Sequence, residues 1–170
     1  WRSQLCFSTV TERLGPNGFK IYAVVFMVLL LLRPVVMIAL GISDEGSLPL
    51  PAVVRVIVPL LLAVPAIYTL YSVARYFGFY RAMGADHFDP VYRSVPLVKE
   101  GIFRFTRHSM YSFGFLLFWL IAFAFASRAA LVTSLFAHAY IWVHYFCTEK
   151  PDMELIYGPQ RSDPAPPPSA

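Results

Sequence analysis

Residues 111–147, YSFGFLLFWLIAFAFASRAALVTSLFAHAYIWVHYFC, contain no Asp, Glu or Lys and a single Arg. That residue, Arg128, follows Ser127 and separates two apolar stretches, Tyr111–Ala126 and Ala129–Cys147. A helix needs about 20 apolar residues to cross the roughly 30 Å hydrocarbon core of a bilayer, and each stretch is close to that length. Because the break between them is so short, the two stretches are predicted to form an antiparallel transmembrane hairpin.

Two further apolar stretches precede the hairpin, one from Phe19 to about Ile42 and one from about Val53 to Val73. The 170-residue chain is 58% hydrophobic and only 14% charged, so it has too little polar surface for an ordinary soluble domain. The fold class predicted from these patterns is all-α. We expect a polytopic membrane protein with about four transmembrane helices, of which the last two form the hairpin.

The basic residues indicate how the chain is oriented. The loop at Ser43–Ala52 has no Lys or Arg, whereas the segment between the second and third spans has six. These six are Arg75, Arg81, Arg93, Lys99, Arg104 and Arg107. The positive-inside rule therefore places this segment and both termini on the cytoplasmic side of an integral membrane protein. The same rule accounts for the net charge of +4, so nucleic-acid binding is not expected.

Common soluble catalytic and metal-binding patterns are missing from the sequence. There is no GxGxxG, P-loop, HExxH or GxSxG motif. Cys6 and Cys147 have neither disulfide-framework nor zinc-ligand spacing, so we expect free thiols and no metal. Bis-histidine haem ligation is disfavoured because no other predicted span carries a histidine to face those of the last one.

Polar groups within the spans are candidates for function. At 100° per residue, His138, Trp142, Tyr145 and Glu149 share one helical face. An interfacial aromatic belt explains Tyr145 and Glu149 but not the deeper His138. Arg33, which precedes a helix-kinking Pro34, is consistent either with an anionic ligand or with a snorkelling side chain.

Arg55 follows the loop that carries Asp44 and Glu45. We interpret it as one member of a structural surface ion pair with that loop.

A basic and aromatic motif leads into the third span. It comprises residues 101–111, GIFRFTRHSMY, and the segment 149–158, EKPDMELIYG, follows the hairpin. Alone, the first motif would be consistent with a juxtamembrane anchor for anionic lipid. Together, the two motifs resemble those of the integral-membrane methyltransferases that act on isoprenylcysteine carboxylates and on phospholipids such as phosphatidylethanolamine. The residues that match the family pattern are Gly101, Phe103, Arg104, Arg107, His108, Met110, Tyr111, Glu149, Tyr157 and Gly158.

Two positions depart from the family pattern, and a third matches it only loosely. Ser109 stands where the first motif usually has Pro, and Lys150 replaces the second glutamate of a pair, although Glu154 lies one turn further on. Gly84 is only a loose counterpart of a glycine motif in the phospholipid enzymes.

The resemblance implies S-adenosylmethionine as the cofactor, bound at the cytoplasmic face. It implies a cofactor site formed by Gly101, Arg107, His108, Met110, Tyr111, Tyr145 and Glu149, with His108 and Glu149 as catalytic residues. His108 or His138 would be the base if the methyl acceptor is an amine. We expect a single domain at residues 1–158, with 81–158 as its cofactor-binding core. Residues 159–170 contain five prolines and are predicted to form a disordered tail.

The methyl acceptor implied by the resemblance is a membrane lipid or a lipidated substrate, with a phospholipid amine as the first choice. An isoprenylcysteine carboxylate and a small thiol or amine are the alternatives. Ser109 and Lys150 lie inside the motifs, so a non-catalytic subunit of a larger membrane complex is the competing hypothesis.

Overall fold

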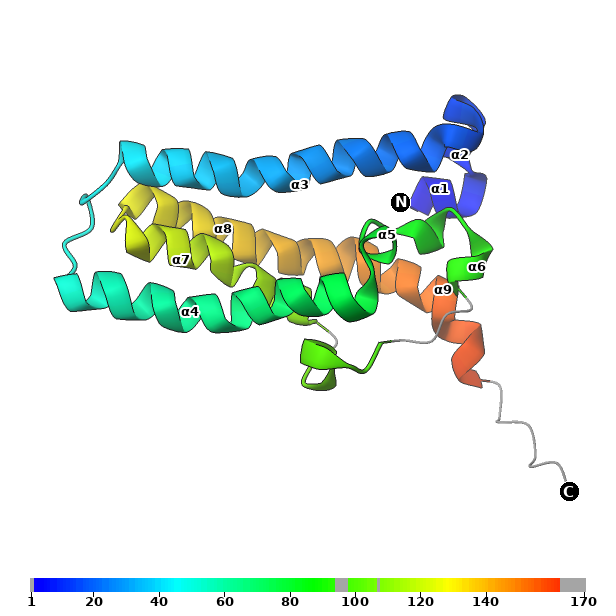
Figure 1. Ribbon diagram of the computed structural model, residues 1–170. Coiled ribbons are helices and arrows are strands. Elements are labelled where there is room, and N and C mark those ends of the chain that lie inside the picture. Colours follow the sequence, from blue (N-terminus) through cyan, green and yellow to red (C-terminus); the bar gives the residue numbers. More distant parts are fainter. Residues whose placement is uncertain (1, 94–97, 107, 163–170) are drawn as a thin grey trace, which may run out of the picture.

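The computed structural model describes residues 2–93, 98–106 and 108–162, and every regular element in this part of the chain is helical (Figure 1). The main helices are α3 (Gly18–Ser43), α4 (Ala52–Ser72), α7 (Leu116–Ala124) and α8 (Arg128–His144). Shorter helices flank and connect them: α1 (Arg2–Phe7), α2 (Thr9–Leu14), α5 (Phe79–Ala82), α6 (Pro90–Arg93) and α9 (Lys150–Ser162). Single 3-10 turns occupy Gly15–Asn17, Ala85–His87 and Gly101–Arg104.

The predicted all-α membrane fold is confirmed. Three helical segments are long and apolar enough to cross a bilayer: Thr9–Ser43, Ala52–Phe77 and Arg128–Tyr157. The third predicted span is the shorter apolar helix Met110–Ala124, which covers about 22 Å at about 1.5 Å per residue. Many apolar side chains on the long helices are exposed, as expected of surfaces that face lipid rather than water.

The short helix α7 lies at the centre of the bundle. It packs against α4 on one side and against α3 and α8 on the other (Figure 1). The core at this level consists of Met37, Phe118, Ile121, Ala122 and Ala130. Its central position and its antiparallel packing on α8 confirm the predicted hairpin.

Helix α3 approaches the turn of the hairpin closely at Gly41. A Cβ atom placed on Gly41 would lie 2.7 Å from the Phe125 ring, so only glycine fits without a shift of that ring. Earlier in α3, the Arg33 side chain is exposed, and the helix continues unbroken through Pro34.

The loop between α3 and α4 is fastened to the start of α8 through one carboxylate. Asp44 Oδ2 accepts hydrogen bonds from Ala129 N, Ser127 Oγ and Ser47 Oγ, each at 2.8 Å. These donors, with Ala129 N as the strongest, hold the pKa of Asp44 below its ordinary value of 3.8. The carboxylate thereby satisfies an N-terminal amide of α8 that has no partner within the helix.

The exposed pair predicted at this loop is also present. Arg55 Nη2 lies 3.0 Å from Glu45 Oε1, with both side chains well exposed.

Three π-helical turns interrupt the helices at the opposite end of the bundle. They lie at Val73–Phe77 after α4, at Met110–Gly114 before α7 and at Tyr145–Glu149 after α8. Such turns are rare and occur frequently at functional sites. Beyond them, α9 continues through residues 159–162, the first part of the predicted tail, and residues 163–170 lie outside the described part of the chain.

Candidate functional site

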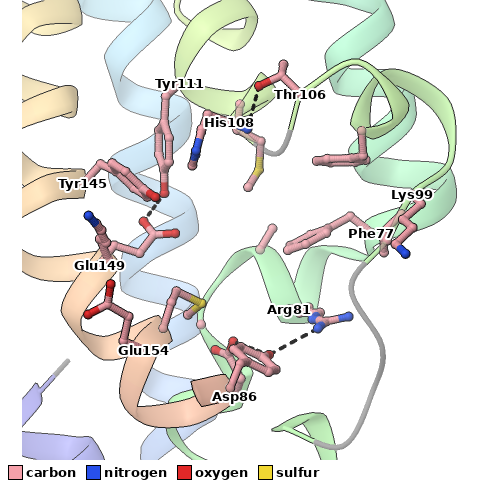
Figure 2. A pocket seen from close by; sticks show the side chains of 18 of the residues that line it. Phe77, Arg81, Asp86, Lys99, Thr106, His108, Tyr111, Tyr145, Glu149 and Glu154 are labelled. Atoms are coloured by element: carbon pink, nitrogen blue, oxygen red, sulfur yellow. Dashed lines mark hydrogen bonds between the residues drawn. The ribbon is translucent and has the colours of Figure 1, made fainter. Parts of the chain in front are cut away.

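A cavity of about 780 Å³ lies at the end of the bundle where the three π-helical turns gather (Figure 2). Its walls come from the end of α4 with α5, the turn at Ala85–His87, the segment Val98–Thr106, the start of the α7 segment, and the junction of α8 with α9. A volume of roughly 300–1,000 Å³ is usual for a small-molecule site. The cavity is therefore large enough for a cofactor.

The first motif enters the cavity through His108, Met110 and Tyr111. Thr106 Oγ1 accepts a hydrogen bond from His108 N at 3.1 Å, which fixes the chain just before the helix starts. The His108 carbonyl then accepts hydrogen bonds from Tyr111 N and Ser112 N. This local geometry directs the His108 and Tyr111 side chains toward the same space (Figure 2).

Aromatic side chains of α8 and of the π-helical turn that follows it contact the first motif. The Tyr145 ring centroid lies 4.6 Å from that of His108 and 5.5 Å from that of Tyr111. Trp142 contacts the same two rings at 5.9 and 6.2 Å. Two residues of the predicted stripe, Tyr145 and Glu149, thus line the cavity, whereas His138 and Trp142 are not among its lining residues.

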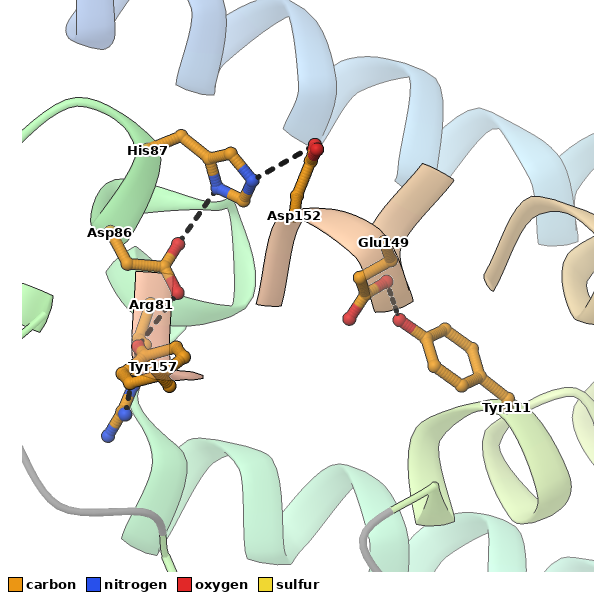
Figure 3. Close-up of polar contacts among 7 residues, drawn as sticks. All are labelled: Arg81, Asp86, His87, Tyr111, Glu149, Asp152 and Tyr157. Carbon is orange, nitrogen blue, oxygen red and sulfur yellow. Dashed lines mark hydrogen bonds and ion pairs between the residues drawn. The ribbon is translucent and has the colours of Figure 1, made fainter. Parts of the chain in front are cut away.

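A hydrogen bond joins the two motifs directly. The Tyr111 hydroxyl donates to Glu149 Oε2 across 38 residues of sequence (Figures 2 and 3). The Glu149 carboxylate is partly buried and lines the cavity. Glu154, one turn further on, is exposed and also lines the cavity. Glu154 therefore places a second carboxylate at the site although Lys150 replaces the usual second glutamate.

The other two predicted cofactor-binding residues differ from this group. Arg107 lies outside the described residues. Gly101 is not among the residues that line the cavity, and it packs closely against its neighbours. Its φ of +60° favours glycine, and an added Cβ would lie 2.6 Å from Ser72 Oγ and 2.8 Å from the Tyr76 ring.

A buried polar cluster forms the wall opposite Tyr111 (Figure 3). Its members, all less than a tenth exposed, are Arg81, Asp86, His87, Asp152 and Tyr157. Arg81 Nη2 donates to the Tyr157 hydroxyl at 3.2 Å, and that hydroxyl donates to Asp86 Oδ2 at 3.0 Å. The His87 ring lies between two carboxylates, with Nδ1 3.0 Å from Asp86 Oδ1 and Nε2 3.6 Å from Asp152 Oδ2. The cluster joins α9 to the α5 region.

The charges in this cluster stabilise one another. Burial alone would raise the pKa of Asp86, but the hydrogen bond and charge of His87 oppose it, as do Tyr157 and Arg81. The net result is a pKa for Asp86 below its ordinary value of 3.8. Asp86 is therefore an ionised partner for its neighbours at neutral pH.

From the sequence, Tyr157 was identified only as a match to the family pattern, and the other members of the buried cluster were not predicted as site residues. One local signal was available, because Asp86 and His87 directly follow the segment around Gly84, which already had a loose family counterpart. Asp152 lies one turn beyond Glu149 and shares its end of the helix. Neither signal identifies the partners, because the contacts join residues about 70 positions apart, such as Asp86 and Tyr157.

The fold and the cavity define a polytopic helical membrane protein with a cavity of small-molecule size at one end. The sequence profile of the family described as Phospholipid methyltransferase matches residues 54–160, which is well over half of the chain. The chain therefore belongs to the phospholipid methyltransferase family, and the matched region includes all the walls of the cavity. No curated protein and no solved structure matches the chain.

Proposed function

We propose that this chain is an S-adenosylmethionine-dependent methyltransferase whose acceptor is the amine of a phospholipid headgroup. The single observation that carries the proposal is the hydrogen bond from Tyr111 to Glu149, because it brings two distant motifs of a methyltransferase family to one cavity. The active face would be cytoplasmic, as the distribution of basic residues predicts.

The lining of the cavity fits S-adenosylmethionine. The cofactor carries a sulfonium, an ammonium, a carboxylate and a ribose diol. Tyr111, Tyr145 and His108 offer aromatic faces on which a sulfonium is stabilised by cation–π contact. Glu149 supplies a carboxylate for the ammonium group or for a ribose hydroxyl.

Charges of both signs line the cavity. The carboxylates are Asp86, Glu149 and Glu154, and the cations are Arg81, Lys99, Arg104 and Lys150. A zwitterionic headgroup has an ammonium and a phosphate, and it requires the same two kinds of partner. The combination supports a phospholipid amine over an acceptor with one charge.

The cofactor supplies an activated methyl group on its sulfonium, and the residues of the chain bind and orient the reactants. Most of the rate enhancement in such an in-line transfer comes from the attack geometry. Tyr111 and Tyr145 would define the wall of the cofactor site, and Glu149 would fix its polar end. His108 would accept the proton that an ammonium acceptor loses before it attacks, and it would pass that proton to solvent.

The competing hypothesis of a non-catalytic subunit rests on Ser109 and Lys150. Glu154 weakens the argument from Lys150 for this hypothesis, because the cavity retains two carboxylates, Glu149 and Glu154, on the same helical segment. The proposal therefore predicts activity despite both departures from the family pattern.

A labelled-methyl assay tests the proposal. Purified protein in nanodiscs of total membrane lipid is incubated with methyl-labelled S-adenosylmethionine, and the lipid classes are then separated. We expect label in an aminophospholipid class, at least about a tenfold loss for Glu149→Gln, and no loss for the matched control Glu12→Gln on the exposed helix α2. No label in any lipid would contradict the proposal, and label in an added isoprenylcysteine peptide alone would reassign the acceptor.

A further inference from the structure

A second, smaller cavity of about 370 Å³ lies at the same end of the bundle as the main cavity. It is formed by two parts of the chain that are distant in sequence, the stretch from α2 to the start of α3 and the segment from α5 to α6 (Figure 1). No residue that lines the main cavity also lines this one. The second cavity is therefore a separate space, which the proposed chemistry does not use.

Three aromatic rings line the second cavity, those of Phe19, Tyr80 and Phe88. The Phe19 ring centroid lies 5.9 Å from that of Tyr80 and 5.1 Å from that of Phe88, with interplanar angles of 39° and 54°. Because the rings are tilted and not stacked, part of their faces remains open to a ligand, and Tyr80 is 60% exposed. An aromatic face attracts a cation that lies within about 6 Å of the ring centroid.

One carboxylate, that of Asp89, completes this lining. Its Oδ1 accepts a hydrogen bond from Val91 N at 2.9 Å. Among the described residues, none that lines the cavity is Lys, Arg or His, and no ion pair includes Asp89. The second cavity thus combines aromatic faces with a negative charge that no neighbouring cation balances.

This combination selects one kind of cation. A primary ammonium has three N–H groups, each of which needs an acceptor, whereas a quaternary ammonium has none and presents methyl groups to its surroundings. Aromatic rings with a single carboxylate therefore suit the quaternary ion. Phe19 lies at the start of the membrane-spanning helix α3, so the cavity is at the depth of the lipid headgroups.

We propose that the second cavity binds the quaternary ammonium headgroup of a choline lipid. The three rings hold the cation by cation–π contact, and Asp89 supplies the counter-charge. A phospholipid amine that has gained three methyl groups has this headgroup. To regard the bound lipid as the reaction product rests on the proposed function, whereas binding itself does not.

The second cavity shares a wall with the main one. Tyr80 and Ala85 line the second cavity, and their neighbours Arg81 and Asp86 line the first. The two cavities thus lie on opposite sides of one short segment. A choline lipid in the second cavity would be held next to the site that methylates it.

The test uses 3-fluorotyrosine placed genetically at position 80 and ¹⁹F NMR in nanodiscs of phosphatidylglycerol, which contain no choline lipid. Titration with choline should shift the signal and saturate. The probe 3,3-dimethylbutan-1-ol has the shape of choline without its charge, and it should bind at least about tenfold more weakly. Ethanolamine, which keeps the charge and lacks the methyl groups, should also bind more weakly.

Two variants test the named residues. Asp89→Asn retains the Oδ1 acceptor for Val91 N, so it should fold normally and bind choline about tenfold more weakly. Phe88→Leu keeps an apolar side chain without a ring and should bind about threefold more weakly. The matched control Glu12→Gln removes a nearby exposed carboxylate that does not line the cavity, and it should bind choline like wild type.

A second titration distinguishes the lipid from free choline. Phosphatidylcholine added to the nanodiscs should reproduce the shift in wild type and not in Asp89→Asn. A shift with free choline alone would overturn the assignment to a lipid headgroup. Equal affinity for choline and 3,3-dimethylbutan-1-ol, an unchanged Kd in folded Asp89→Asn, or no shift at all would overturn the site. Protein that transfers no methyl group would refute the proposed function and leave the choline titration as the measure of this one.

Discussion

The two ends of the bundle use carboxylates for different purposes. At the loop between α3 and α4, Asp44 is satisfied by neutral donors that belong to its own loop and to the start of α8. At the cavity end, Glu149 accepts a hydrogen bond from Tyr111, and Asp86 contacts Tyr157 and the adjacent His87, beside a space of about 780 Å³. The difference indicates that the carboxylate at the first end serves the fold alone, whereas those at the second end also hold charge next to a cavity.

This comparison predicts that substitutions at the cavity end reduce activity, and stability as well where they break the buried cluster, and that substitutions at the loop end reduce stability alone. The largest effect is expected for His108→Gln. Loss of a general base lowers kcat by about 10²- to 10⁴-fold, while the thermal unfolding temperature should change little because the variant retains a polar side chain of similar reach. Steady-state kinetics and a thermal melt in the same nanodiscs measure both quantities. Wild-type kcat in folded His108→Gln would show that the base is elsewhere.

The second effect concerns the buried cluster. Asp86→Asn leaves Arg81 and His87 without their charged partner, so the free energy of unfolding should fall by about 3 kcal/mol. The pKa of Asp86 is lower in the folded protein than in the unfolded chain. The ionised carboxylate therefore contributes its full stabilisation at pH values above the unfolded-state pKa near 3.8, and this contribution is lost as the pH falls through the folded-state pKa. The difference in stability between wild type and variant should shrink correspondingly at acidic pH.

Denaturant unfolding followed by circular dichroism measures this effect. The exposed neighbour Asp89 provides the matched control, because Asp89→Asn removes a charge from the same segment without breaking a buried pair. Equal losses for the two variants would refute a specific role for the cluster.

The third effect concerns the loop between α3 and α4. Asp44→Asn weakens the contacts with Ala129 N, Ser127 and Ser47, so the unfolding temperature should fall by about 2–5 °C with methyl transfer unchanged. Because the pKa of Asp44 is also lowered on folding, the stability difference should be present at neutral pH and disappear well below pH 3.8. A thermal melt at several pH values measures it, and a loss of activity at unchanged stability would contradict the division between the two ends.

The smallest effect is expected for Arg55→Ala. The pair with Glu45 is exposed to solvent on both sides, with side chains 36% and 53% accessible. Such pairs contribute about 0–1 kcal/mol, so stability and activity should both stay close to wild type. A clear loss of stability in a thermal melt would show that this pair stabilises the loop more than an ordinary surface pair.

Much of the fold could be predicted from the sequence because lipid imposes a simple pattern. The apolar lengths at Gly18–Ser43 and Ala52–Ser72 and the short break at Ser127 are local signals, and they identified both ends of α3 and α4 and the start of α8 to within about one residue. The shortness of the α7 segment is also visible in the sequence, because the predicted stretch Tyr111–Ala126 agrees with the helical segment Met110–Ala124 to within two residues.

The site could be predicted only where its residues form motifs. His108, Tyr111 and Glu149 have fixed spacing along the chain, whereas His87 and Asp152 are brought together by packing of α9 against the turn after α5. The role of Gly101 likewise depends on Ser72 and Tyr76, which a local pattern does not reveal. Contacts of this kind depend on tertiary packing, and a single sequence does not encode them locally.

The central claim is that the cavity end, and not the loop end, binds S-adenosylmethionine. The most direct measurement is calorimetric titration of the cofactor into wild type, Glu149→Gln and Asp44→Asn in identical nanodiscs. We predict the same Kd for wild type and Asp44→Asn, and a Kd at least about tenfold higher for Glu149→Gln. The absence of binding to wild type, or equal Kd values for wild type and Glu149→Gln, would contradict the claim.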